Sequence, residues 1–215
     1  MARIIIIGGH GHIAQHLTTL LAEQGDQVTS VIRNPEQTTT VTDLGAQALV
    51  ADIEQLGTAE IAALLAEHDA VVWSAGAGGG DPARTYAVDR DAAIRTIDAA
   101  EQAGVDRFVM VSYFGASADH GIDPENSFFA YAESKAQADE HLRASGLAWT
   151  VLGPSGLTHD EPTGAIDAAA AEASDVPRAD VAAVIRAALV EPRSIRQTIR
   201  FNAGETSIGE ALRTV

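Results

Sequence analysis

The chain has 215 residues, of which 46% are hydrophobic and 20% are charged, so it can bury one sizeable core and is not a disordered protein. It carries 30 acidic residues against 14 lysines and arginines, which gives a formal net charge of −16. This charge repels phosphate backbones and anionic lipids, so neither nucleic acid nor a membrane is expected as a partner. Because cysteine is absent, disulfides, thiolate catalysis and Cys-ligated metals are excluded.

Short β-branched runs alternate with longer helical patterns along the chain. Strands are expected at residues 3–7, 27–32, 48–50, 70–73, 107–111, 148–152 and 198–201. Helices are expected at residues 13–23, 58–66, 83–103, 128–144 and 178–190. Several strands are continuous apolar runs, typical of strands that helices cover on both faces. The pattern predicts an α/β fold with a doubly wound parallel sheet, in a single domain over residues 1–215.

Irregular segments follow three of the predicted strands, at residues 76–82, 115–127 and 154–175. The carboxyl edge of the sheet is where open α/β folds bind ligands, so these segments are expected beside a binding site. The later two are predicted to form small substrate-side loops. Within the last, the alanine-rich residues 168–173 are compatible with either a short helix or a mobile flap.

The apolar run that begins the chain is too short for a secretory signal peptide, and no stretch approaches the ~20 apolar residues of a membrane span. A cytoplasmic protein is therefore expected. No exposed apolar helix face is evident from the sequence, which leaves the oligomeric state open.

A glycine-rich loop joins the first predicted strand to the first predicted helix, and Gly8, Gly11 and Ala14 recur there at a spacing of three. Glycines at this place allow a sharp turn and bring backbone N–H groups close to a pyrophosphate at the helix N-terminus. Nucleotide binding is therefore predicted for the loop residues Gly8, Gly9, His10, Gly11, His12 and Ile13.

The second predicted strand ends at Arg33, where NAD-preferring sites usually carry an acidic residue that binds the ribose 2′-hydroxyl. A guanidinium suits the 2′-phosphate of NADP, so NADP is predicted to be preferred over NAD. Later strands also end in residues that could contact the cofactor: Asp52, Ile53, Ser74, Ala75 and Gly76.

Three histidines lie on or beside the glycine-rich loop, and His12 and His16 are spaced as i and i+4 on a helix. No carboxylate motif at ligand spacing accompanies His10, His12 and His16. No metal site is therefore predicted.

A tyrosine and a lysine share one face of the helix predicted at 128–144, because Tyr131 and Lys135 lie one turn apart. Proton transfer to a carbonyl oxygen requires a tyrosine whose pKa is brought down from ~10 by a nearby cation, which Lys135 could supply. The lysine could also donate to the nicotinamide ribose. Lys135 is the only lysine beside 13 arginines, and Ser112 is placed at a strand end to hydrogen-bond a substrate carbonyl.

With these residues the chain resembles the short-chain dehydrogenase/reductase superfamily, in its atypical, single-domain NAD(P)H-binding branch. The resemblance runs end to end. It includes the glycine motif at residues 8–14, Ser112, the Tyr131 and Lys135 pair, and the segments 151–158 and 177–182. Where relatives often have an arginine before the proline of the first segment, this chain has Gly153.

The resemblance implies a Rossmann fold and an NAD(P)-dependent oxidoreductase acting on a small carbonyl or conjugated acceptor. Tyr131 would be the general acid/base, Lys135 the ribose-binding lysine and Ser112 the carbonyl-polarising group. Cofactor contacts beside the nicotinamide are implied for four further residues: Pro154, Ser155, Gly156 and Leu157.

Two other functions stay open. A non-catalytic NADP(H) sensor would control a protein partner through its ligand state, but it would not need Ser112, Tyr131 and Lys135 together. A sugar-nucleotide epimerase or dehydratase would use the same tyrosine and lysine with a tightly held NAD. The segment after residue 153 is too short for the substrate domain that such enzymes carry.

Overall fold

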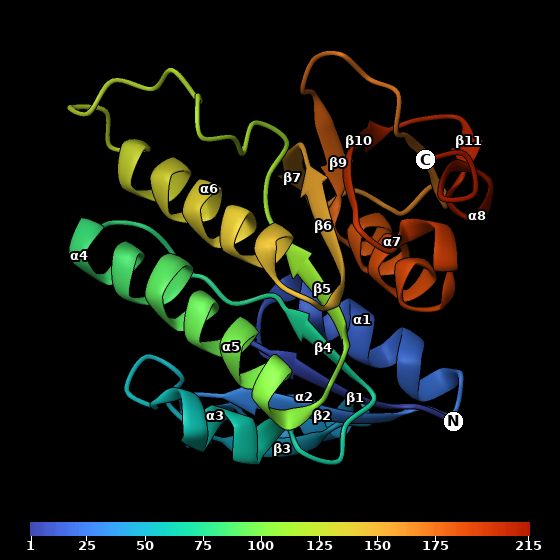
Figure 1. Ribbon diagram of the computed structural model, residues 1–215. Coiled ribbons are helices and arrows are strands. Elements are labelled where there is room, and N and C mark those ends of the chain that lie inside the picture. Colours follow the sequence, from blue (N-terminus) through green and yellow to red (C-terminus); the bar gives the residue numbers. More distant parts are fainter.

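Seven segments form the parallel part of a nine-stranded sheet in the computed structural model, which describes residues 1–215 (Figure 1). The parallel strands are β1 (Arg3–Ile7), β2 (Gln27–Ile32), β3 (Gln47–Val50), β4 (Ala70–Trp73), β5 (Arg107–Val111), β6 (Ala148–Pro154) and β10 (Gln197–Ala203). Their order is β3-β2-β1-β4-β5-β6-β10, so the direction of winding reverses between β1 and β4. This confirms the predicted doubly wound α/β fold.

Two short antiparallel strands extend this sheet beyond β10. They are β8 (Ala165–Asp167), which pairs with β10, and β11 (Thr206–Ser207), which pairs with β8. A separate two-stranded sheet is formed by β7 (Gly156–Thr158) and β9 (Asp175–Pro177).

Helices cover both faces of the sheet. One face carries α1 (His12–Glu23), α2 (Thr38–Asp43), α7 (Arg178–Val190) and α8 (Ile208–Ala211). The other carries α3 (Thr58–Leu65), the π-helix η2 (Tyr86–Ala92), α5 (Ala93–Ala103) and α6 (Phe129–Ala144). The short helix α4 (Pro82–Thr85) runs directly into η2, and the 3₁₀ turns η1 (Pro35–Gln37) and η3 (Pro192–Ser194) complete the elements. No helix is long and apolar enough to cross a bilayer.

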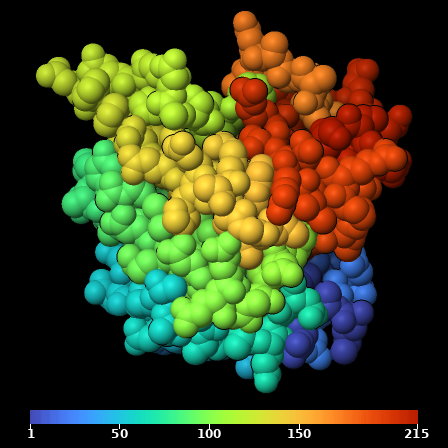
Figure 2. All heavy atoms as spheres, viewed as in Figure 1, coloured from blue at the N-terminus to red at the C-terminus, as the bar shows by residue number.

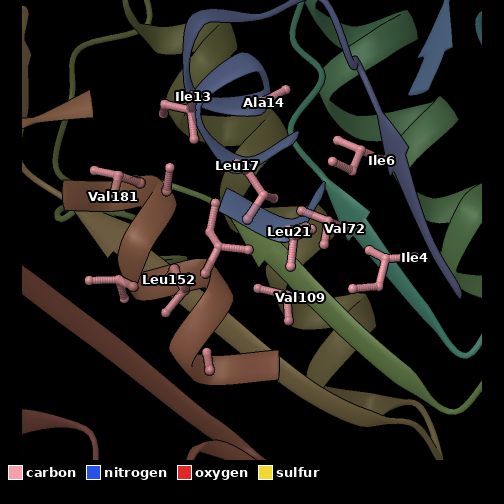
Figure 3. Packing of buried hydrophobic residues seen from close by; sticks show 14 of the residues in the cluster. Ile4, Ile6, Ile13, Ala14, Leu17, Leu21, Val72, Val109, Leu152 and Val181 are labelled. Atoms are coloured by element: carbon pink, nitrogen blue, oxygen red, sulfur yellow. The ribbon is translucent and has the colours of Figure 1, made fainter. Parts of the chain in front are cut away.

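The side chains of β1 alternate between two buried clusters. Ile4 and Ile6 pack with α1 and α7 on one face, as Figure 3 shows, whereas Ile5 and Ile7 pack with α3, α5 and α6 on the other. Because both faces are covered, the strand reads as an unbroken apolar run. Each fully buried isoleucine contributes about 1.5–3 kcal/mol of transfer free energy, which fixes the first strand and its adjoining loop in the middle of the sheet.

The segment at residues 154–175 is more ordered than the sequence predicted. It contains β7 and β8 and leads into β9, and residues 168–173 form no helix. Three-residue strands are too short to show a periodicity, and their hydrogen bonds come from partners distant in the sequence. The segment at 115–127 has no helix or strand. In the space-filling view these two segments project at the same end of the molecule, with a hollow between them (Figure 2).

Candidate active site

The loop between β1 and α1 approaches the end of β4 so closely that only glycine fits. Gly8 has a φ of +85°, and a Cβ added there would lie 2.6 Å from the Cα of Ala75. A Cβ on Gly9 would lie 2.4 Å from the Cβ of Ser30 on β2. Helix α1 begins after Gly11 with no side-chain cap and no acidic residue in its first turn. The helix N-terminus can therefore accept an anion.

A cleft of about 340 Å³ opens at the winding reversal between β1 and β4. Nine of the residues predicted to bind the cofactor line it: Gly8, His10, Gly11, Arg33, Asp52, Ile53, Ser74, Ala75 and Gly76. Its wall also includes residues that the sequence did not single out, among them Asn34, Gln37, Glu54, Arg84 and Val88. The place and composition of the cleft fit a dinucleotide that lies across the carboxyl ends of the strands.

Two guanidinium groups meet one carboxylate on the wall of this cleft. Glu54 Oε2 lies 3.9 Å from Arg33 Nη1 and 3.5 Å from Arg84 Nε, and Arg33 is the more exposed of the two arginines. Arg84 also donates from Nη1 to the carbonyl of Ala77 at 2.5 Å. Arg84 comes from α4, far along the chain from Arg33, which is why no local pattern indicated it. The cleft therefore offers two cations to an anionic ligand.

Several residues predicted to contact the cofactor lie outside the wall of the cleft. Gly9 faces Ser30, Ile13 is buried in the core, and the ring of exposed His12 lies edge-on to His159 with centroids 5.1 Å apart. No group of three or more His, Cys, Asp or Glu side chains comes together as a metal centre would need.

The residues from Pro154 to Leu157 have structural partners. Pro154 ends β6 and is buried. Ser155 is also buried, and its hydroxyl hydrogen-bonds the carbonyl of Phe201 at 3.2 Å and the side chain of Asn202. Gly156 and Leu157 belong to β7, where a Cβ on Gly156 would collide with Asp175. The observed contacts of this segment tie β6 to β10 and β9.

A larger side chain at Gly153 would be crowded by its neighbours. It pairs with Arg200 on β10, and a Cβ added to it would lie 3.0 Å from Arg200 Cγ and 3.1 Å from the carbonyl of Tyr113. The guanidinium of Arg200 lies 5.8 Å from the ring centre of Phe114. An arginine, Arg200, therefore lies beside this position on the neighbouring strand β10, although residue 153 itself is glycine.

The predicted catalytic residues come from the end of β5 and from α6. Lys135 is only 2% exposed, and its Nζ donates to the carbonyl of Val111 at 2.7 Å. It therefore lies against the last residue of β5, directly before Ser112. The sequence predicted that Lys135 would bind a ribose, and Lys135 does not line the 340 Å³ cleft.

Ser112 is turned toward α6. Its hydroxyl donates to Oδ2 of Asp139 at 2.5 Å, and both side chains are buried. The second carboxyl oxygen of Asp139, Oδ1, is buried without a hydrogen-bond partner. Sequence reasoning missed Asp139, although its position four residues after Lys135 places both on one helical face.

Asp89 joins the cleft to this buried group. Its Oδ2 accepts from the backbone N–H of Ala77 at 2.8 Å, and a Cβ added to Gly76 in the cleft would lie 3.0 Å from its Oδ1. Burial raises the pKa of Asp89, and the nearby ammonium of Lys135 opposes that shift. Asp89 lies on the π-helix η2, a distortion often found at functional sites, and the sequence pattern gave no sign of it.

The environment of Tyr131 differs from the prediction. Burial raises the pKa of its phenol above the usual value, and the carboxyl groups of Asp89 and Asp139 raise it further. The sequence predicted a lowered pKa through Lys135, and that prediction was wrong for this structure. Burial is the larger cause, and two acidic groups that approach from η2 and from α6 itself add to it, because low polarity and negative charge both disfavour the phenolate.

Three aromatic rings gather at the start of α6. The ring centres of Tyr113, Phe128 and Tyr131 lie 5.1–5.5 Å from one another. Burial raises the pKa of Tyr113, with Asp139 a smaller cause. Phe128 remains 43% exposed, so one side of this cluster faces solvent beside the segment 115–127.

A parallel sheet with a glycine-rich loop at its winding reversal and a cleft across its carboxyl ends defines a dinucleotide-binding protein of the Rossmann class. The model of the NAD(P)H-binding family matches residues 8–192. The chain belongs to this family.

Relatives match over the full length. A Bacillus subtilis protein named "Uncharacterized sugar epimerase YhfK" is 35% identical over 215 residues, which cover 98% of this chain and 99% of that protein. A putative NAD-dependent epimerase/dehydratase from Bacillus halodurans superposes with a TM-score of 0.91 at 30% identity, covering 100% of both chains. The oxidoreductase ylbE from Lactococcus lactis gives a TM-score of 0.89 at 27% identity, covering 99% of this chain and 96% of that one.

Proposed function

We propose that the protein is an NADPH-dependent oxidoreductase that reduces a small carbonyl compound or conjugated acceptor. The position of Asp89 carries the proposal. Its carboxyl group lies beside Gly76 of the cleft and is close enough to Lys135 and Tyr131 to affect their electrostatics. Asp89 thus links the cleft to Tyr131, which supports a site where the tyrosine protonates an acceptor held beside the bound cofactor.

The cationic side of the cleft supports NADPH as the cofactor. Arg33 directly follows β2, where a Rossmann fold holds the adenosine ribose, and Arg84 approaches the same carboxylate, Glu54, from α4. No acidic residue follows β2 directly, since Ile32 is followed by Arg33 and Asn34. A bound NADPH would supply the hydride, while the protein residues orient the acceptor and deliver the proton.

Tyr131 is the proposed proton donor. The phenol is protonated at neutral pH, as proton donation in the direction of reduction requires, although its raised pKa makes it a weaker acid than the sequence predicted. As the carbonyl π bond breaks, the phenolic O–H bond breaks too and a new O–H bond forms on the acceptor oxygen. The resulting phenolate would be stabilised by the ammonium of Lys135, one helical turn away, until it regains a proton from solvent.

The proposal is tested by titrating NADPH and then following its oxidation with a panel of quinones, aldehydes, ketones and flavins. Tyr131→Phe should bind NADPH with an unchanged Kd, while kcat falls by about 100-fold or more because the proton donor is gone. Tyr86→Phe, which removes a phenol outside the proposed site, is the matched control and should keep full activity.

Two results would contradict the proposal. NADPH binding without turnover on the whole panel would favour a sensor that controls a partner. Failure of both NADPH and NADH to bind would remove the cofactor itself from the proposed function.

Epimerisation is a second candidate, because the full-length Bacillus subtilis relative is named a sugar epimerase. An epimerase returns the hydride to its substrate, so it consumes no NADPH. Such an enzyme would interconvert sugar epimers without a change in nicotinamide absorbance and would retain bound NAD through purification. Net oxidation of NADPH by an acceptor is the result that favours the reductase.

A further inference from the structure

The hydrogen bond between Ser112 and Asp139 determines whether the Ser112 hydroxyl can donate a hydrogen bond to a substrate. The two oxygens are 2.5 Å apart, and Asp139 is the only hydrogen-bond partner of the hydroxyl. Ser112 is 4% exposed and Asp139 is fully buried. This distance lies at the short end for O–H···O bonds, as expected when a carboxyl group takes part.

A hydroxyl has one hydrogen and two acceptor lone pairs, and an ionised carboxylate can only accept. If Asp139 is ionised, the single hydrogen of Ser112 must point at it. A substrate carbonyl would then meet only lone pairs on Ser112. If Asp139 is protonated, its own hydrogen can occupy the bond and the Ser112 hydrogen is released for a second partner.

Burial favours the protonated form of Asp139 and opposes the effect of the positive charges around it. On α6, Lys135 and Arg143 attract its negative form, and the Ser112 hydroxyl also stabilises it. Burial outweighs these three and raises the pKa of Asp139. The phenols of Tyr131 and Tyr113 also face it; burial is the main cause of their raised pKa values, and a charge on Asp139 would raise them further.

Asp89 approaches the same lysine from η2. One buried ammonium therefore serves two buried carboxyl groups, and leaving both ionised would leave an uncompensated charge in a low-dielectric site. The two acids are not equivalent. Each leaves its Oδ1 without a partner, but Asp89 Oδ2 accepts from the backbone N–H of Ala77, which can only donate, whereas Asp139 Oδ2 faces the Ser112 hydroxyl, which can also accept. The backbone donor favours Asp89 as the ionised member of the pair.

We infer that Asp139 is a neutral carboxylic acid that donates to Ser112 Oγ, so that the Ser112 hydrogen is free to donate to the substrate oxygen. Asp139 is thus a positioning residue that acts through Ser112. Neither residue gives up its proton, because the transferred proton comes from Tyr131. The inference rests on the proposed function in one respect, namely that Ser112 faces a substrate oxygen.

Infrared difference spectroscopy of the intact protein locates the proton without turnover. At neutral pH the wild type should show the C=O stretch of a buried protonated carboxylic acid. Asp139→Asn should remove that band, and Asp89→Asn should leave it in place. If Asp139→Asn leaves the band unchanged, or if Asp89→Asn abolishes it, the inference is overturned.

Kinetics test whether Asp139 acts through Ser112. Asp139→Asn keeps an N–H donor toward Ser112 and should retain kcat/KM within about tenfold, while Asp139→Ala should lose about 100-fold, as removal of one positioned donor does. In a Ser112→Ala background, Asp139→Ala should cost nothing further. Additive losses, or equal losses in the Asn and Ala variants, would show a merely structural role.

The pH dependence of kcat/KM is a further test, because it would not change on substitution if Asp139 had only a structural role. In the wild type, kcat/KM should fall as rising pH ionises Asp139 and draws the Ser112 hydrogen away. Asp139→Asn should lose that falling limb because an amide does not titrate. The NADPH Kd and Tm of each variant check folding. If the infrared band behaves as expected but no acceptor is reduced, the proposed function fails and the proton assignment stands.

Discussion

Lys135 is a buried ammonium, and its neighbours explain how the fold tolerates it. The amine donates to the Val111 carbonyl at 2.7 Å, and its charge interacts electrostatically with two carboxyl groups, those of Asp89 and Asp139. An unpaired buried ammonium would lose its proton or destabilise the fold by several kcal/mol. The only lysine of the chain is therefore held by acidic residues from two different elements.

At the same scale, Arg33 should set the choice of cofactor. Arg33→Ala should raise the Kd for NADPH about tenfold or more, because a charge-assisted hydrogen bond to phosphate is lost, and leave the Kd for NADH within about twofold. Arg213→Ala, a distant exposed arginine, controls for the change in net charge. Equal weakening of both nucleotides, measured by fluorescence titration, would refute the role given to Arg33.

At the scale of elements, the segment 82–103 contains a π-helical distortion that positions two residues of the candidate site. The sequence predicted one helix over 83–103, and the structure has α4, η2 and α5 in direct succession. The π turn presents Val88 to the cleft and Asp89 to the buried cluster. In a π-helix, backbone hydrogen bonds join residues five apart. This pattern depends on tertiary packing, and the helix preferences of the individual residues do not predict it.

Arg107 ties β5 to its neighbours and should be a stability determinant. It donates to the carbonyls of Ala148 and Ala188, each at 2.6 Å, and to the hydroxyls of Thr150 and Ser194. These acceptors belong to β6, α7 and η3. The cationic side chain is largely buried without a carboxylate partner, which lowers its pKa to about 10.

Arg107→Met should lower the free energy of unfolding by about 2 kcal/mol or more, because buried carbonyls lose their donor. Urea unfolding followed by circular dichroism measures the change. Arg186→Met on α7 is a matched control, since its guanidinium makes no hydrogen bond, and it should change stability by less than about 0.5 kcal/mol. Equal effects of the two variants would contradict the bridging role.

For the whole molecule, the net charge of −16 should make stability depend on salt. Ion pairs between arginines and carboxylates are few, and all except Arg90 with Asp91 are 3.5 Å or longer, so repulsion between acidic groups is the larger effect. Raising NaCl from about 10 mM to about 150 mM, which shortens the screening length to about 8 Å, should raise the Tm. Thermal melts across this range would contradict the expectation if the Tm fell.

Most of the sheet and the cleft could be predicted because they depend on local patterns. Apolar runs and amphipathic repeats located the seven parallel strands and the long helices, and the glycine spacing located the loop at the winding reversal. The short strands β7, β8 and β9 could not be found this way, because each is three residues long and pairs with distant residues. Arg84 was missed for the same reason, since it reaches the cleft from another element.

By itself the sequence determined the α/β class, the dinucleotide-binding loop and the pairing of Tyr131 with Lys135 on one helix. Only the tertiary structure decided the electrostatics of that pair. It buried Tyr131 and brought Asp89 from η2 close to it, and burial together with that carboxylate raised the pKa of Tyr131 where a lone lysine would have lowered it. Desolvation and charge proximity depend on all the elements that surround a side chain, so helical spacing alone could not predict them.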